Sequence, residues 1–167
     1  MRNSRGFTMF ELIIVMVVIV ILSAITFVSI SFYADARLNS VADKVANDIR
    51  YARDLAASTA DWYGVEFGAD PANTYHVFWD AATGESDVED PARFGDRLNV
   101  DLSDKFSSSI SSVDIDGGNK VVFDAYGKPY DDRGGTALAD EGSIVLQSGG
   151  NTVTIYITPE TGRVRVE

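Results

Sequence analysis

The 167-residue chain has no cysteine and only one histidine, His76. Without cysteine it cannot form a disulfide, a thiolate metal site or a cysteine nucleophile. His76 lies in the β-rich run 75–79 and has no second histidine with which to form a usual zinc site, so we interpret it as a structural side chain. No G-x-S-x-G nucleophile motif is present. We therefore expect no enzyme activity and no cofactor.

Positive charge is also scarce. The chain has 14 Lys and Arg residues against 25 Asp and Glu residues, which gives a net charge of −11. Such a surface repels nucleic acid and anionic lipid head groups at long range, and it favours solubility. Nonspecific nucleic-acid binding is therefore a poor default function.

Helix-breaking residues are missing from a long N-terminal stretch, because neither proline nor glycine occurs between Phe7 and Ala60. The first part is apolar: Leu12 to Ile30 would measure about 28 Å as a helix, roughly the thickness of a bilayer core. The second part places apolar residues every three or four positions, as an amphipathic helix does. These residues are Leu38, Val41, Val45, Ile49, Ala52 and Leu55. We predict one helix of about fifty residues, with an assembly half and an amphipathic half.

Charge around the apolar stretch predicts its orientation in a membrane. Arg2 and Arg5 precede it, and no positive residue follows until Arg37, so the N-terminus is expected in the cytoplasm and the chain beyond about Ala34 outside. A cleavable secretory signal and an uncleaved signal anchor are the alternatives. Ala34-Asp35-Ala36 offers a small-x-small cleavage site, but the apolar stretch exceeds the usual length of roughly 7 to 15 residues.

Glu11 is the one charged residue between Arg5 and Asp35, and both alternatives leave it unexplained. A carboxylate at the centre of a bilayer costs about 2.5 to 3.5 kcal/mol, and such groups usually have a cationic partner. No lysine or arginine follows within helical reach. Hydrolysis of the Gly6–Phe7 bond would create a cation, the α-amino group of Phe7, one helical turn before Glu11. That amine could meet Glu11 within one chain or between staggered chains.

Arg5-Gly6, the following Phe7-Thr8-Met9-Phe10-Glu11-Leu12 and the long apolar run resemble the class III signal of type IV pilins and pseudopilins. The resemblance implies that a prepilin peptidase cuts after Gly6 and methylates the Phe7 amine. It also implies that Glu11 pairs with the amino terminus of a neighbouring subunit during assembly. The expected partners are this peptidase, other pilin or pseudopilin subunits, an inner-membrane assembly platform and the lipid bilayer.

After Ser58 the pattern changes to short β-rich runs separated by turn residues. Strands are expected at 62–67, 75–79, 120–124, 142–146, 152–157 and 163–166, the first two as antiparallel neighbours. Residues 81–104 are expected to form a long surface loop with one short strand near 98–102. The predicted fold class is α+β, a pilin-like "lollipop" in which a small antiparallel β-sheet head packs on the C-terminal half of a long helix. Its parts are the leader 1–6, the transmembrane and assembly half 7–34, the amphipathic half 35–60 and the exported head 61–167.

The order of these elements, with VVFDAYGKP, GSIVLQSGGNTVTIYI and TPETGRVRVE, resembles the GspH/FimT branch of minor pseudopilins and minor pilins. This resemblance implies a structural subunit of a type II secretion pseudopilus or a type IV pilus. It also implies a single-pass protein of the bacterial inner membrane, with its head in the periplasm before assembly into the fibre.

Gly162-Arg163-Val164-Arg165 resembles a tail motif that contributes to DNA binding in some competence-associated members. Arg163 and Arg165 would lie on one strand face, where they could contact adjacent phosphates. Glu160 and Glu167 flank them, however, and a charged edge strand that discourages sheet addition explains the same residues. A DNA-binding minor pilin is therefore the alternative function.

Asp114 and Asp116 begin a run, DIDGGN, that has oxygen ligands at alternate positions and a glycine for the turn, as a calcium loop does. The run lacks the third aspartate and the final glutamate of an EF-hand. We therefore interpret it as a hairpin turn and predict no metal site, with calcium at Asp114 and Asp116 as the weaker alternative.

Overall fold

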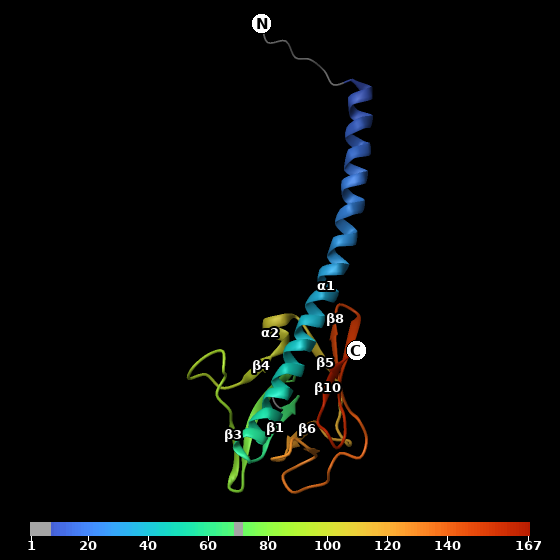
Figure 1. Ribbon diagram of the computed structural model, residues 1–167. Coiled ribbons are helices and arrows are strands. Elements are labelled where there is room, and N and C mark those ends of the chain that lie inside the picture. Colours follow the sequence, from blue (N-terminus) through green and yellow to red (C-terminus); the bar gives the residue numbers. More distant parts are fainter. Residues whose placement is uncertain (1–7, 69–71) are drawn as a thin grey trace. The chain divides into compact units, whose positions relative to one another are not determined.

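The computed structural model describes residues 8–68 and 72–167, and for residues 24–34 it describes the backbone only. The chain divides into two compact units, Met1–Ala36 and Arg37–Glu167. Figure 1 shows that one helix runs through both of them.

Helix α1 spans Met9–Thr59, 51 residues, which confirms the predicted helix of about fifty residues. It continues this far because no residue in the segment breaks it, and it ends where Ala60 adopts a left-handed backbone with φ of 58°. Within the first unit the side chains of residues 8–23 are exposed. Among the described residues no helix is both long and apolar enough to cross a membrane. The predicted transmembrane half, 7–34, lies partly outside the described residues.

The second unit contains two antiparallel sheets. The first has the order β3-β2-β1-β6-β7, and β4 also pairs with β2. The second has the order β10-β9-β8-β5. Their bounds are β1 Tyr63–Phe67, β2 Thr74–Ala81, β3 Gly84–Asp87, β4 Asn99–Asp101, β5 Ser109–Asp114, β6 Lys120–Phe123, β7 Pro129–Tyr130, β8 Gly142–Ser148, β9 Asn151–Ile157 and β10 Val164–Val166. A short helix, α2 Leu102–Phe106, follows β4.

One hydrophobic core joins both sheets to the second half of α1. The predicted apolar stripe is buried at Leu38, Val41, Val45, Ile49 and Ala52. Its last member, Leu55, is half-buried, and the stripe is widened by buried Ala42, Ala46 and Ala56. The α+β fold class is therefore confirmed, with two sheets that share one core with the second half of the helix.

The first predicted strand pair is confirmed, because β1 and β2 are antiparallel with Tyr63 opposite Trp79. The prediction of one short strand within 81–104 was incomplete. All four residues of β3 are exposed, so it has no apolar alternation by which to recognise it. Helix α2 depends on a local cap, in which the Asp101 side chain accepts hydrogen bonds from the backbone N–H groups of Ser103 and Asp104. Strands β5 and β7 were also missed.

Candidate functional site

The N-terminal motif is the first candidate site. Gly6 and Phe7 lie outside the described residues, whereas Glu11 lies exposed in the first turn of α1. The Glu11 backbone N–H donates to Thr8 Oγ1 at 3.3 Å. Thr8 and Glu11 have the spacing of a capping box, and a carboxylate near a helix N-terminus is favoured by the helix dipole. The Thr8 hydroxyl thus caps the start of α1, a role that the sequence pattern T-x-x-E indicates and that was not predicted above.

The C-terminal motif is held against α1 through its backbone. Arg50 Nη2 donates to the carbonyl of Val164 at 2.9 Å, and Arg53 Nη1 donates to the carbonyl of Gly162 at 3.4 Å. Gly162 is buried and has a φ of 59°. The glycine of the motif is therefore required by the packing of the head, independently of any ligand.

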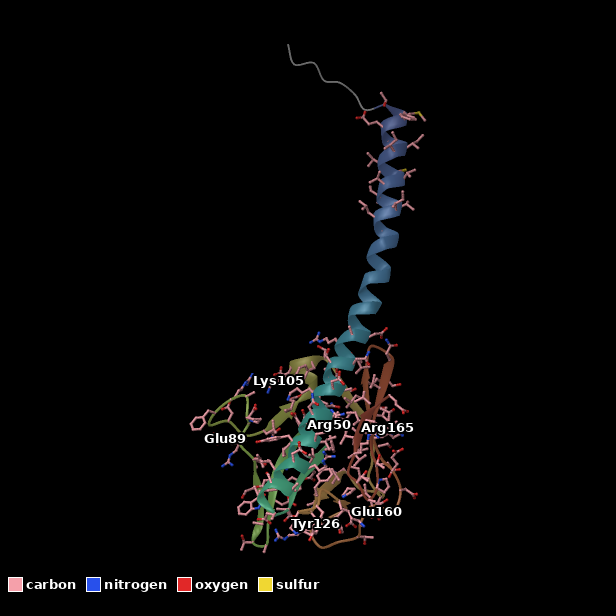
Figure 2. All side chains as sticks on the ribbon, viewed as in Figure 1. Arg50, Glu89, Lys105, Tyr126, Glu160 and Arg165 are labelled. Atoms are coloured by element: carbon pink, nitrogen blue, oxygen red, sulfur yellow. The ribbon has the colours of Figure 1, made fainter. Side chains whose placement is uncertain are left out.

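The two arginines of the motif have different surroundings. The Arg165 guanidinium binds Glu141 through two hydrogen bonds, of 2.7 and 3.3 Å, and also contacts the Glu167 carboxylate. It lies 4.2 Å from the centre of the Tyr156 ring, and these carboxylates, Glu141 first, raise the pKa of Arg165. Arg163 is exposed and makes no ion pair with any described residue. Arg165, which is labelled in Figure 2, lies on β10.

The arrangement does not present two free cations to a nucleic acid, because Arg165 is already neutralised within the head. A phosphate would have to compete with two carboxylates for this guanidinium. Of the two arginines in the motif, only Arg163 could still bind a phosphate, and the net charge of −11 would repel the nucleic acid. DNA binding stays a prediction that the geometry does not favour.

Asp114 and Asp116 lie at a tight turn between β5 and β6, closed by a bridge between Ile115 and Gly118. The two strands belong to different sheets, so the turn is not the predicted hairpin. Asp114 Oδ1 accepts from the Gly117 backbone N–H at 3.0 Å, and Asp116 Oδ2 accepts from the Ala139 backbone N–H at 3.1 Å. Both carboxylates thus accept hydrogen bonds from backbone N–H groups, as aspartate side chains that stabilise a turn do. Calcium binding at these two residues stays an untested alternative.

His76 lies between carboxylates of the neighbouring strands. Its Nε2 is 3.8 Å from Glu66 Oε2 and 3.9 Å from Asp87 Oδ1. Its ring packs 5.6 Å from that of Phe78. These contacts fit the structural role expected from the sequence.

One further group of side chains, an acidic cluster, was not predicted from the sequence. Asp80, Glu85 and Asp132 have carboxylate oxygens within 4.8 Å of one another. Within 8–68 and 72–167, they form the only group of three or more potential metal ligands. Asp80 and Glu85 face each other only because β2 pairs with β3, and β3 has no apolar signal. Asp132 comes from the loop after β7, far from both strands in the sequence.

Residues 1–27 match the prokaryotic N-terminal methylation motif. No curated protein sequence matches the chain significantly.

Two solved structures have a similar fold. The type IV minor pilin FimU of Pseudomonas aeruginosa is 16% identical, with a TM-score of 0.53 over 81% of this chain and 92% of that chain. The minor pseudopilin EpsH from the type 2 secretion system of Vibrio cholerae is 10% identical, with a TM-score of 0.56 over 78% of this chain and 96% of that chain. One is named as a minor pilin and the other as a minor pseudopilin. The chain therefore carries an N-terminal methylation motif within residues 1–27, and its α+β fold is shared with a minor pilin and a minor pseudopilin.

Proposed function

We propose that the protein is a minor pilin or pseudopilin, a structural subunit of a type IV pilus or a type II secretion pseudopilus. The observation that carries this proposal is Gly6-Phe7 followed by Glu11, within a matched N-terminal methylation motif and ahead of a pilin-like fold. The leader is 1–6, the transmembrane and assembly half of the helix is 7–34, the amphipathic half is 35–60 and the head is 61–167.

Processing creates the charge that Glu11 needs. A prepilin peptidase cuts between Gly6 and Phe7 and methylates the new amine, which stays positively charged at neutral pH. In the fibre, the Glu11 carboxylate pairs with the Phe7 amine of a neighbouring subunit, in an apolar surrounding where an unpaired carboxylate is costly. The pairing therefore favours subunits that have been processed.

The exposed apolar side chains of the first unit support assembly through the helix. Phe10 is 73% exposed and Val20 is 68% exposed, and the described apolar residues between them are also exposed. A surface of this kind requires a partner. The partner is the lipid bilayer of the inner membrane first, with the N-terminus cytoplasmic and the head periplasmic, and neighbouring helices in the fibre afterwards. An inner-membrane assembly platform would transfer the subunit between the two.

The leader is tested by Gly6→Ala in the native host, with the intact mass of the protein as the readout. Gly6→Ala should accumulate as an uncleaved precursor, because the peptidase requires the glycine that precedes the cut. Ser4→Ala is the matched control, since it changes the leader and keeps Gly6, and it should yield the mature mass. A mature mass for Gly6→Ala would refute the leader assignment.

The role of Glu11 is tested by separating assembly from helix capping. Glu11→Ala should be cleaved normally yet be strongly depleted from sheared fibres, because the amine of the neighbour loses its counter-charge. Thr8→Ala removes the hydroxyl that accepts from the Glu11 N–H and keeps the carboxylate, so it should assemble. Equal losses in the two variants would show that Glu11 acts only at the helix start, and undiminished incorporation of Glu11→Ala would refute the pairing.

A further inference from the structure

The acidic cluster of Asp80, Glu85 and Asp132 joins two parts of the head. Asp80 lies on β2 and is paired across the hairpin with Glu85 on β3. Asp132 lies in the loop that follows β7, and its carboxylate accepts from the backbone N–H of Arg133 at 2.8 Å. The potential ligand oxygens of the three side chains lie within 4.8 Å of one another. Two of the carboxylates are thus fixed by strand pairing and the third by a loop turn.

Asp80 is the unusual member of the cluster. The residue is only 6% exposed, and its Oδ2 is buried without a hydrogen-bond partner among the described residues. Buried carboxylate oxygens in native proteins are almost always paired, because an unpaired one loses its hydration without compensation. Burial, Glu85 and Asp132 raise the pKa of Asp80, whereas Lys120 and Arg133 act in the opposite direction. Lys120 and Arg133 thus act on Asp80 through their charge, but no described residue donates a hydrogen bond to its buried oxygen.

Neither of the two nearby cations satisfies this oxygen. Lys120 Nζ lies 3.1 Å from Glu85 Oε1 and 3.0 Å from Asp132 Oδ1. Arg133 Nη1 donates to the backbone carbonyl of Asp80, and its ion pair is with Asp61, at 3.5 Å. The Lys120 ammonium thus pairs with Glu85 and Asp132. Asp80 has no ion pair in the part of the chain that the structure describes.

We propose that Asp80, Glu85 and Asp132 bind a divalent cation of the calcium type, with the Lys120 ammonium displaced towards solvent. The ligands are all hard oxygens, which favours calcium or magnesium over zinc or copper. Calcium is preferred because it accepts several carboxylates in irregular geometry, whereas magnesium requires a near-ideal octahedron. The two exposed carboxylates leave room for water ligands. Bound cation would give the buried Asp80 oxygen a partner and tie the β2–β3 hairpin to the loop after β7.

The test is terbium luminescence on the full-length chain in detergent, with calcium as the competitor. Terbium replaces calcium at oxygen sites, and Trp79, which precedes Asp80, is a nearby sensitiser. We expect one saturable site from which calcium displaces terbium and magnesium does so poorly. Absence of saturable binding, or better displacement by magnesium than by calcium, would overturn the proposal.

Two variants connect the signal to this cluster. Asp80→Asn and Glu85→Gln should each weaken binding by about tenfold or more, because the number of ligand charges sets the affinity of calcium sites. Glu85 is exposed, so Glu85→Gln remains informative if Asp80→Asn does not fold. Glu160→Gln is the matched control, because Glu160 is also an exposed glutamate paired with a lysine, Lys128, at 2.8 Å. Equal binding by Glu85→Gln and Glu160→Gln would show that calcium binds only to diffuse surface charge.

Lys120→Met tests the displacement itself. If the ammonium and the cation compete for Glu85 and Asp132, removing the ammonium should strengthen calcium binding about tenfold. Unchanged or weaker binding by Lys120→Met would contradict the competition. The inference does not depend on the proposed function, since both the probe and the variants report on the head alone.

Discussion

Replacing Gly162 by alanine tests whether the glycine of the C-terminal motif is needed for packing. Gly162 has a φ of 59°, and an added Cβ would overlap the carbonyl oxygen of Gly127 and lie 3.0 Å from the Phe123 ring. The left-handed backbone costs an alanine about 1 to 2 kcal/mol. Forcing a methyl group into a packed site adds about 1 to 3 kcal/mol. Gly162→Ala should therefore lower the free energy of unfolding by about 2 to 5 kcal/mol.

Gly134 offers a matched control for this variant. It also has a left-handed backbone, with φ of 67°, but no atom lies within 4 Å of a Cβ built there. Gly134→Ala should therefore lower the free energy of unfolding only by the backbone term, about 1 to 2 kcal/mol. The difference between the two variants isolates the overlap with Gly127.

Urea unfolding followed by tryptophan fluorescence is the assay. Both tryptophans, Trp62 and Trp79, lie in the head, so the signal reports on the second unit without a contribution from the first half of α1. Equal losses of unfolding free energy in Gly162→Ala and Gly134→Ala, at unchanged m-values, would refute the packing argument.

Two further predictions concern a buried hydrogen bond and the DNA alternative. Tyr75 is fully buried and its hydroxyl donates to Asp48 Oδ2 at 2.5 Å, so Tyr75→Phe should destabilise the head by about 1.5 to 3 kcal/mol in urea unfolding. Burial and Asp48 raise the pKa of the Tyr75 hydroxyl above its value in the unfolded chain. The stabilisation by this hydroxyl is therefore present below about pH 10 and is lost as the pH rises further. If the unfolding free energies of Tyr75→Phe and the wild type had the same pH dependence, this role of the Tyr75 hydroxyl would be contradicted. In gel shifts with the full-length chain, we expect no DNA retardation at low salt, whereas salt-dependent retardation that an Arg163/Arg165 double alanine variant abolishes would establish the DNA-binding alternative.

The sequence predicts those parts of the fold in which local pattern and tertiary environment agree. Helix α1 is predictable because nothing between Phe7 and Ala60 breaks it. Strands β8 and β9 are predictable because both are rich in β-branched and apolar residues and because Gly149-Gly150 marks the turn between them. In contrast, β3 has the polar sequence Gly-Glu-Ser-Asp and is a strand through its pairing with β2, so no apolar pattern in the sequence predicts it.

The candidate sites divide in the same way. The N-terminal motif is contiguous in the sequence, so its residues could be identified before the fold was known. The acidic cluster instead depends on the pairing of Asp80 with Glu85 and on a distant loop that supplies Asp132. The C-terminal motif could be recognised in the sequence, but the neutralisation of Arg165 could not. Its partners Glu141 and Tyr156 are distant in the sequence and are brought together only by the fold.

The central claim is that the chain is a processed pilin-like subunit, and the N-terminus of the protein purified from its host tests it most directly. Tandem mass spectrometry of the N-terminal peptide should show that the mature chain begins at Phe7 with a methyl group on its amine. An N-terminus at Arg37 would instead identify Ala34-Asp35-Ala36 as a secretory signal site, and an N-terminus at Met1 would identify an uncleaved anchor. Either of these results would contradict the account.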